Sequence, residues 1–242
     1  DTYFCEDFTD HMEPYMEQWK KRDFVPDGIY TGFLSDEKQA DKILKLMDTF
    51  AGEDTLILTD PVMGDDGEVY PIYTEALRNR FCELVRRSYV ITPNLTEALI
   101  LLYGKEKMEA IWREFQEISG RERLDQIEET GRRLAKEFSL SAVVITGVDY
   151  REGEELVKIG NLVLEKEKSS WVFAEKSGGS YSGTGDLFAS VLSAGLVKGY
   201  SMKKCAHLAV DFISASIRDA VEEGTDRNDG VCFEAHLGRL IQ

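Results

Sequence analysis

The chain has 242 residues, of which 29 are basic and 45 acidic, so its formal net charge is −16. Hydrophobic residues make up 43% of the sequence, which is enough to build a sizeable core and argues against disorder. The negative charge argues against nucleic acid and anionic membrane as main partners, because both need a basic face. The longest apolar run, residues 187–197, is shorter than the roughly 20 residues of a membrane-spanning helix.

Four cysteines are spread over the chain: Cys5, Cys82, Cys205 and Cys232. They form no C-x-x-C pair and have no cluster of histidines nearby. This spacing favours free thiols in a cytoplasmic protein over a disulfide framework or a zinc site.

Short runs rich in β-branched residues alternate with longer amphipathic runs in the first two thirds of the chain. In chain order, they predict a helix near 4–22, a strand at 28–31, a helix at 36–50, a strand at 55–59, a helix at 73–87, a strand at 89–92, helices at 95–103 and 121–138, and a strand at 142–146. This alternation predicts an α/β fold whose mainly parallel sheet is covered by helices on both faces.

The last third of the chain has a different order of elements. Residues 158–165 and 170–175 alternate like an antiparallel hairpin, and helices are predicted near 184–198, 202–223 and 233–240. The charged segment 105–137 predicts a solvated helical face rather than a binding patch. Because no linker or repeat interrupts the chain, we expect residues 1–242 to form a single domain.

Polar residues follow several of the predicted strands. Asp60 and Asp65 come after the strand at 55–59, Asn94 and Glu97 follow the strand at 89–92, and Gly147 follows the strand at 142–146. In an open α/β sheet, ligands bind beyond the carboxyl ends of the strands. The sequence therefore predicts the active site at this edge of the sheet.

A glycine-rich turn, Gly183-Thr184-Gly185-Asp186, leads directly into a predicted helix. Free backbone amides at a helix start form an anion site, and glycines let the backbone approach the ligand closely. A carboxylate beside such a site is expected if Asp186 accepts the proton of a hydroxyl that attacks a phosphate. The alternative is that Asp186 is only a favourable residue in the first turn of the helix.

Three carboxylates at the predicted strand ends point to magnesium, which prefers a few carboxylates together with waters and phosphate oxygens: Asp60, Asp65 and Glu97. Asn94 and Glu97 share one face of a helix start and could reach the same ion. They also fit a simple capping box, with Asn94 as the cap. No serine or cysteine is paired with a histidine, and no P-loop spacing is present, which disfavours acyl transfer and a Walker-type site.

Four motifs occur in the order seen in the ribokinase-like superfamily: Asp60-Pro61-Val62-Met63-Gly64-Asp65, Thr92-Pro93-Asn94-Leu95-Thr96-Glu97, Val144-Ile145-Thr146-Gly147 and Gly183-Thr184-Gly185-Asp186-Leu187-Phe188-Ala189-Ser190. The sequence most resembles the vitamin B6 branch of that superfamily, the pyridoxal/pyridoxamine kinases. The resemblance covers essentially the whole chain. It implies a three-layer α/β/α fold and ATP-dependent phosphorylation of the 5′-hydroxymethyl group of pyridoxal, pyridoxine or pyridoxamine.

The resemblance also implies residue roles. Asp186 would be the catalytic base and contact the substrate, and the amides of Gly183, Thr184 and Gly185 would form the anion hole. The residues implied for ATP and Mg²⁺ are Asp60, Asp65, Asn94, Glu97 and Thr146. Those implied for a monovalent cation, K⁺ or Na⁺, are Asp60, Thr92 and Thr146. Phe33 and Tyr70 would lie near the pyridine ring, and a homodimer is expected.

Two alternatives remain open. Hydroxymethylpyrimidine kinases of thiamine synthesis share much of this pattern but typically carry cysteine at the position of Asp186. A non-catalytic protein that binds vitamin B6 or nucleotide would also fit. Family members begin with a strand, a glycine-containing turn and a helix before the region that matches Asp1. We therefore expect that this first strand–helix unit is missing from the sequence.

Overall fold

The structure is a computed structural model that describes residues 6–152 and 156–241. Its main sheet has six strands in the order β1-β2-β5-β6-β7-β8. The bounds of these strands are β1 Gly28–Thr31, β2 Leu56–Thr59, β5 Val90–Ile91, β6 Ala142–Glu152, β7 Leu156–Glu165 and β8 Lys168–Glu175. The pairs from β1 to β6 are parallel, and β6, β7 and β8 pair antiparallel. This agrees with the predicted α/β fold and with the predicted antiparallel hairpin.

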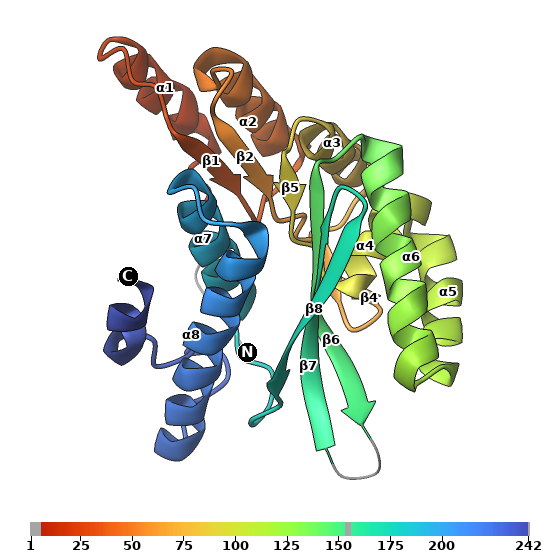
Figure 1. Ribbon diagram of the computed structural model, residues 1–242. Helices are drawn as coiled ribbons and strands as arrows, with labels where there is room; N and C mark the ends of the chain where they lie inside the picture. The colour runs from red at the N-terminus through yellow and green to blue at the C-terminus, as the bar shows by residue number, and fades with distance from the viewer. Residues whose placement is uncertain (1–5, 153–155, 242) are drawn as a thin grey trace.

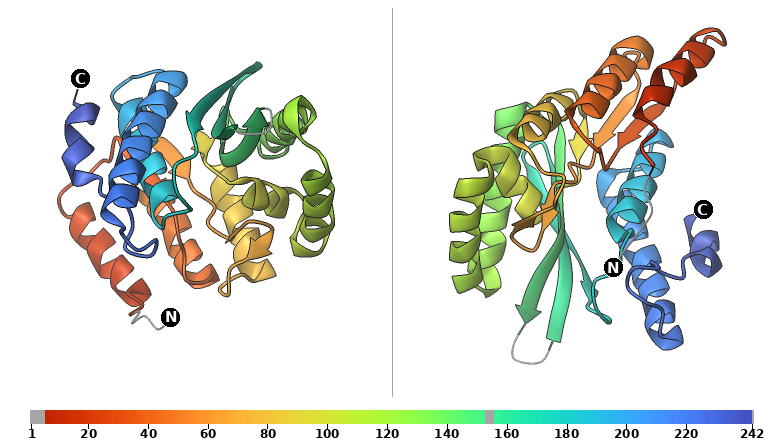
Figure 2. Two further views of the ribbon diagram at one scale, coloured as in Figure 1. Left: turned by 90° about the horizontal axis from the view of Figure 1, so that it is seen from below. Right: turned by 180° about the vertical axis from the view of Figure 1, so that it is seen from behind.

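Helices cover both faces of the sheet (Figures 1 and 2). The α-helices are α1 Met12–Lys20, α2 Glu37–Phe50, α3 Glu75–Arg86, α4 Leu95–Tyr103, α5 Lys105–Glu117, α6 Gly120–Phe138, α7 Thr184–Val197 and α8 Met202–Glu223. Two 3₁₀ helices, η1 Thr9–His11 and η2 Glu234–Leu240, lie near the chain ends. In the described part of the chain, no helix is both long and apolar enough to span a membrane.

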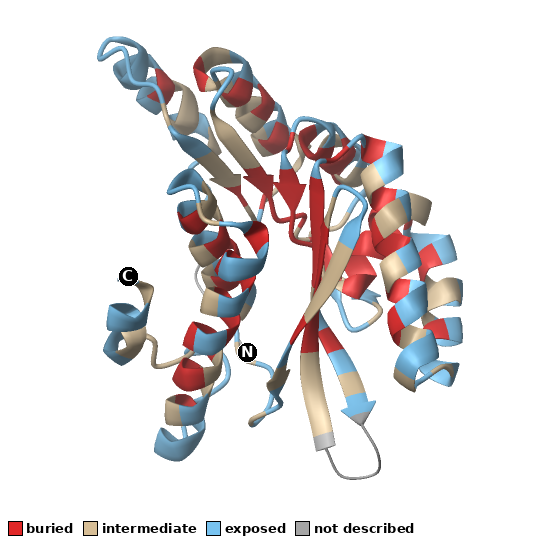
Figure 3. Cartoon of the chain, in the orientation of Figure 1, coloured by how far each residue is buried: buried red, intermediate tan, exposed pale blue. Residues whose placement is uncertain are grey.

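The alternation of side chains along the strands builds two separate cores. Val143 and Ile145 of β6 face the core formed with α2 to α6, whereas Ala142 and Val144 face the core formed with α7 and α8. Successive residues of a strand point to opposite faces, so one buried strand supplies both cores. The sheet centre is accordingly the most continuously buried part of the molecule (Figure 3).

Local capping sets the starts of α2 and α3. The side chain of Asp36 accepts a hydrogen bond from Gln39 N at 2.9 Å, and that of Thr74 accepts one from Leu77 N at 3.0 Å.

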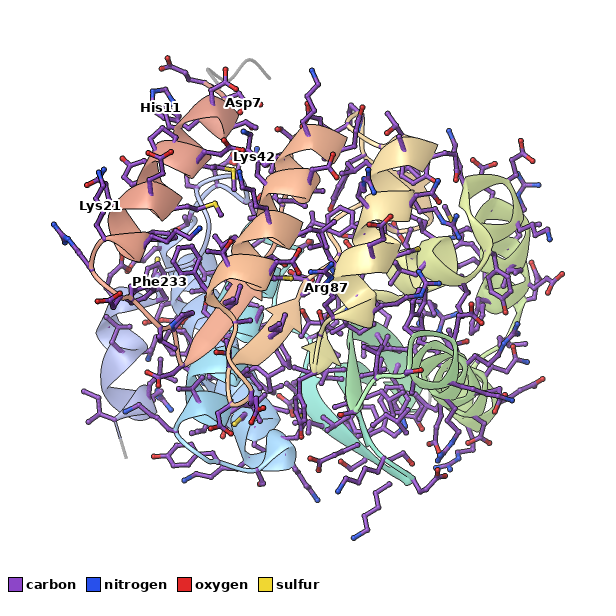
Figure 4. All side chains as sticks on the ribbon, turned by 90° about the horizontal axis from the view of Figure 1, so that it is seen from above. Asp7, His11, Lys21, Lys42, Arg87 and Phe233 are labelled. Atoms are coloured by element: carbon purple, nitrogen blue, oxygen red, sulfur yellow. The ribbon has the colours of Figure 1, made fainter. Side chains whose placement is uncertain are left out.

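Figure 4 shows α1, α2 and α3 side by side, with Lys42 of α2 directed toward α1. Its ammonium lies 3.4 Å from the carboxylate of Glu13.

The first predicted helix was placed too early. Phe4 and Cys5 lie outside the described residues, and α1 begins at Met12 after the single turn of η1. Proline is tolerated in the first turn of a helix but not in its interior, because it lacks an amide hydrogen. A helix starting at residue 4 would bury Pro14 in its interior, whereas the observed start places Pro14 in the first turn.

One further prediction was too short. The strand predicted at 142–146 continues to Glu152, because the sheet absorbs Gly147 as a bulge between Ile145 and Val148 with a φ of +69°. The charged segment 105–137 is helical, in α5 and most of α6, and most of its charged residues are exposed, as predicted. The inner faces of these two helices bury Met108, Phe115, Leu124, Ile127 and Leu134. A small hairpin between β3 Gly64–Asp65 and β4 Glu68–Val69 was not predicted.

Candidate active site

The carboxyl ends of the parallel strands meet at one edge of the sheet. Thr31 of β1 pairs with Thr59 of β2, which pairs with Ile91 of β5. The next residues continue the same ladder, since Asp60 N donates to Thr31 O at 2.8 Å and Thr92 N donates to Thr59 O at 3.2 Å. Asn94, after β5, forms an isolated parallel bridge with Thr146 of β6. The predicted residues Asp60, Thr92, Asn94 and Thr146 therefore lie at the same level on neighbouring strands.

The helix α7 begins at this edge. Gly183, the residue before its first turn, has a φ of +81°, a left-handed conformation that favours glycine. Within the described residues, the amides of Gly183, Thr184 and Gly185 have no hydrogen-bond partner. The first amides of a helix lack internal partners, and the helix dipole adds positive potential there. The turn has the geometry of an anion site.

Asp186 lies in the first turn of α7 and its side chain is exposed. The hydroxyl of Tyr30, in β1, donates a hydrogen bond to Asp186 Oδ1 at 3.1 Å. Asp60 approaches the same turn from β2, because its Oδ2 is 3.9 Å from the position that a Cβ on Gly185 would take. Two predicted carboxylates and the predicted anion site thus come together around the start of α7.

Asp60 is almost completely buried, with 6% of its surface exposed. Burial and the charge of Asp186 raise the pKa of Asp60 to about 7, although the nearby Thr92 hydroxyl acts to lower it. In the described part of the chain, Thr92 Oγ1 is the one buried side-chain polar atom that makes no hydrogen bond of normal geometry. A buried carboxyl beside an unsatisfied hydroxyl oxygen is a donor set suited to a hard cation.

Asn94 and Glu97 form the capping box of α4 that the spacing allowed. Asn94 Oδ1 accepts from Glu97 N at 2.9 Å, and Glu97 Oε2 accepts from Asn94 N at 2.9 Å. The other oxygen, Glu97 Oε1, accepts from Met63 N at 3.2 Å. Burial and the charge of Asp60 raise the pKa of Glu97 well above its usual range. Glu97 therefore holds two backbone segments at the site.

The β3–β4 hairpin brings Asp65 to the same edge. Asn94 Nδ2 donates to Gly64 O at 2.8 Å and so ties the hairpin to α4. Burial raises the pKa of the Asp65 carboxyl, and the charge of Arg227 acts in the opposite direction. Burial, followed by the charges of Asp65, Glu97 and Asp60, raises the pKa of Tyr70 to about 12. Tyr70 thus lies close to the three carboxylates.

The residues present fit a cation that is completed by its ligand. No three histidine, cysteine, aspartate or glutamate side chains of the described residues converge into a closed metal cage. Magnesium commonly takes one or two carboxylates and fills its remaining positions with water and substrate phosphates. Asp60 and Asp65 suit that role better than Glu97, because both oxygens of Glu97 already accept hydrogen bonds from amides.

Phe33 is the predicted site residue on the segment that follows β1. Its side chain is 58% exposed, and it follows Gly32, which lies beside Asp186. A cavity of about 450 Å³ between β8, α8 and η2 contains none of the predicted site residues.

Two residues at the site escaped the sequence reasoning, Tyr30 and Arg227. Tyr30 lies near the carboxyl end of the strand predicted at 28–31, so the strand-end argument applies to it as well. Arg227 carries no such signal, because it reaches the site through the loop after α8. Its carbonyl oxygen accepts from Ser182 N at 2.9 Å, next to the anion site.

The mainly parallel sheet, with carboxylates at its strand ends beside the glycine turn that starts α7, has the ribokinase-like arrangement that the four sequence motifs predicted. Comparison of the sequence with known families agrees. The sequence model of the phosphomethylpyrimidine kinase family matches residues 16–230, and the chain belongs to that family. The pyridoxine kinase of Bacillus subtilis (strain 168) is 28% identical over 170 residues, which are 68% of this chain and 54% of that enzyme. The match thus spans about half the length of that relative.

Solved structures repeat the fold. A Bacteroides thetaiotaomicron protein assigned as a phosphomethylpyrimidine kinase superposes with a TM-score of 0.84 and 29% identity, covering 98% of this chain and 77% of that one. A second crystal structure under the same name from Bacteroides thetaiotaomicron, in another crystal form and with pyridoxal, superposes with a TM-score of 0.82 and 28% identity. It covers 98% of this chain and 78% of that one. The pyridoxal kinase of Lactobacillus plantarum gives 0.81 with 21% identity, covers 99% and 80% of the two chains, and so shares the fold.

Proposed function

We propose that this chain transfers the γ-phosphoryl group of ATP to the 5′-hydroxymethyl group of a vitamin B6 compound. The observation that carries the proposal is the exposed Asp186 carboxylate in the first turn of α7, beside the unpartnered amides of Gly183–Gly185. The B6 substrate class is supported by the similarity to a pyridoxine kinase and to a protein crystallised with pyridoxal. ATP as the donor is supported by pyridoxal kinases of the same fold that were crystallised with ADP.

In this mechanism, Asp186 accepts the proton of the hydroxymethyl group as the oxygen of that group attacks the γ-phosphorus. The bond from the γ-phosphorus to the β–γ bridging oxygen of ATP breaks, and ADP is the leaving group. The amides of Gly183, Thr184 and Gly185 bind the transferred phosphoryl group, whose negative charge they stabilise with fixed dipoles. Most of the rate enhancement then comes from holding the alcohol and the phosphoryl group in line, since phosphoryl transfer needs little covalent help from protein.

Asp60 and Asp65 are the proposed holders of Mg²⁺, and Asp60, Thr92 and Thr146 those of a monovalent cation. Bound magnesium would neutralise charge on the nucleotide phosphates. Asn94 and Glu97 support this arrangement by fixing the backbone at Met63 and Gly64. Phe33 and Tyr70 are proposed to line the space for the pyridine ring.

A second candidate acceptor is hydroxymethylpyrimidine, which is also a heteroaromatic primary alcohol. The family match over residues 16–230 favours it. Asp186 favours the B6 compounds, because the pyrimidine kinases that this sequence resembles typically carry cysteine there.

Replacement of the proposed base tests the function. We expect Asp186→Asn to lower the turnover number by about 10²–10⁴-fold, because the amide cannot accept the proton. ATP affinity, measured by titration calorimetry, should stay near that of the parent chain. The matched control is Asp54→Asn, at an exposed position away from the site, which should keep full turnover.

The assay compares pyridoxal and hydroxymethylpyrimidine side by side with the parent chain. Faster phosphorylation of pyridoxal supports the B6 assignment, and faster phosphorylation of the pyrimidine supports the second candidate. Binding of ATP or pyridoxal without turnover of either alcohol would overturn the kinase proposal in favour of a binding protein. Unchanged turnover in Asp186→Asn would remove Asp186 from the mechanism.

A further inference from the structure

Tyr30 is the side chain that contacts the proposed base directly. It lies in the middle of β1, next to Leu58 of β2, and its ring packs against the core formed with α7 and α8. Its hydroxyl reaches the end of that core and donates to Asp186 Oδ1 at 3.1 Å. The two residues are 156 positions apart. This hydrogen bond therefore connects the sheet edge to the start of α7.

The chemistry of the pair fixes the direction of the hydrogen bond. Burial and the charges of Asp60 and Asp186 raise the pKa of the Tyr30 hydroxyl above its usual range, so it keeps its proton at neutral pH. A carboxylate can only accept, so the hydroxyl is the donor. Hydrogen bonds to an ionised acceptor are stronger than neutral ones and hold their partner in a narrower geometry.

Gly32 leaves room for this contact. A Cβ at Gly32 would lie 3.2 Å from the Tyr30 hydroxyl oxygen and 3.7 Å from Asp186 Oδ1. The first of these distances is tighter than an ordinary contact, so any larger residue would press on the hydroxyl. The segment that follows β1 thus keeps the Tyr30–Asp186 pair accessible from the side of the site.

We propose that Tyr30 is a positioning residue that holds Asp186 Oδ1, so that Oδ2 is left to accept the proton of the substrate alcohol. This inference rests on the function proposed above. An exposed aspartate side chain at a helix start can adopt several rotamers. A hydrogen bond that fixes Asp186 Oδ1 favours one of these rotamers and therefore fixes the position of Oδ2. Rotameric restriction of this kind contributes to catalysis when the reacting atoms must stand in line.

The test is Tyr30→Phe, which keeps the ring in the core and removes only the hydroxyl. We expect kcat to fall roughly 5- to 50-fold, while KM for ATP changes little. Tyr15→Phe is the matched control, because Tyr15 is 61% exposed on α1, away from the site. The unfolding temperature of Tyr30→Phe should stay close to that of the parent, which separates positioning from loss of fold.

A double-mutant comparison makes the test specific to Asp186. If Tyr30 acts through Asp186, adding Tyr30→Phe to the Asp186→Asn variant should not lower kcat any further. An equal loss in both backgrounds would overturn the positioning role, and so would an unchanged kcat in the single variant of an active parent. Absence of turnover in the parent with every alcohol would overturn the proposed function, and this inference with it.

Discussion

Asp60 shows at the scale of one residue how function and stability oppose each other. A carboxyl that is 6% exposed and faces a second carboxylate is costly to ionise, and its pKa of about 7 expresses that cost. Its ordinary value is 3.8. The same burial that destabilises the free charge makes the position favourable for a bound cation, which would restore a charge balance there.

The folded state therefore binds the Asp60 proton more tightly than the unfolded state. Between pH 3.8 and about 7, this difference makes the free energy of unfolding fall as the pH rises, and the full penalty applies above about 7. We expect the free energy of unfolding to fall less between about pH 4 and about pH 8 in Asp60→Asn than in the parent. The difference between the two decreases should be on the order of 1–4 kcal/mol. Urea unfolding without added divalent ions measures this.

Glu97 stays in that variant, so the pH dependence should be reduced rather than abolished. Asp27→Asn, at an exposed position, is the control and should keep the slope of the parent. Equal slopes for the parent and Asp60→Asn would show that Asp60 ionises without penalty in the folded state.

At the scale of elements, the short hairpin β3–β4 determines where Asp65 lies. It places Asp65 at the site, and it is fastened to α4 by the hydrogen bond from Asn94 Nδ2 to Gly64 O. A second bond, from Gly67 N to Thr96 Oγ1 at 2.9 Å, fastens its turn to the same helix. The first turn of α4 thus positions the hairpin.

Gly64→Ala should disrupt this element. A Cβ at Gly64 would collide with the carbonyl oxygen of Glu68 and lie 3.0 Å from Val69 Cα, and neither backbone atom can move without opening the hairpin. We expect a loss of about 1–3 kcal/mol in the free energy of unfolding. We also expect weaker binding of magnesium–ATP, measured by calorimetry, because Asp65 is displaced.

The matched control for that change is Gly52→Ala. Its nearest neighbour would be Thr55 Oγ1 at 3.8 Å, an ordinary contact. If Gly64→Ala loses stability but binds magnesium–ATP as tightly as the parent, the β3–β4 hairpin and its Asp65 do not contribute to binding magnesium–ATP.

At the scale of the whole molecule, a net charge of −16 acts against the proposed chemistry. A nucleotide triphosphate approaches a negative surface, and the site itself adds Asp60, Asp65 and Asp186. Binding then depends on short-range devices, namely the α7 amides, bound cations and single positive side chains such as Arg227. Arg227 is suited to binding phosphate because the backbone hydrogen bond from Ser182 N to Arg227 O holds its loop next to the anion site.

Charge repulsion at this scale should respond to salt. Raising the ionic strength from about 50 to about 300 mM should raise the unfolding temperature, because screening weakens repulsion between exposed carboxylates. We expect KCl to stabilise the parent chain more than choline chloride at equal concentration, since K⁺, unlike choline, is small enough for the cation site proposed beside Asp60 and Thr92. Thermal unfolding of Asp60→Asn is the control, and there the two salts should act alike. Equal effects of both salts on the parent would argue against a monovalent cation at Asp60.

The sequence by itself determined those features that depend on neighbours along the chain. Strand and helix alternation, the cap at Asn94 and the glycine turn before α7 follow from periodicity and from hydrogen bonds that span about four residues. The strand-end argument also found Asp60 and Asn94, because parallel strands end at a common edge.

Only the tertiary structure decided which distant residues meet. The Tyr30–Asp186 hydrogen bond, the approach of Arg227 to Asp65 and the continuation of β6 past Gly147 depend on partners brought in from other parts of the chain. A local pattern carries no information about such partners, because packing and sheet pairing select them after the elements have formed. The capping box at Asn94 and Glu97 illustrates both levels, since its spacing is local but its contact with Met63 is made only in the folded chain.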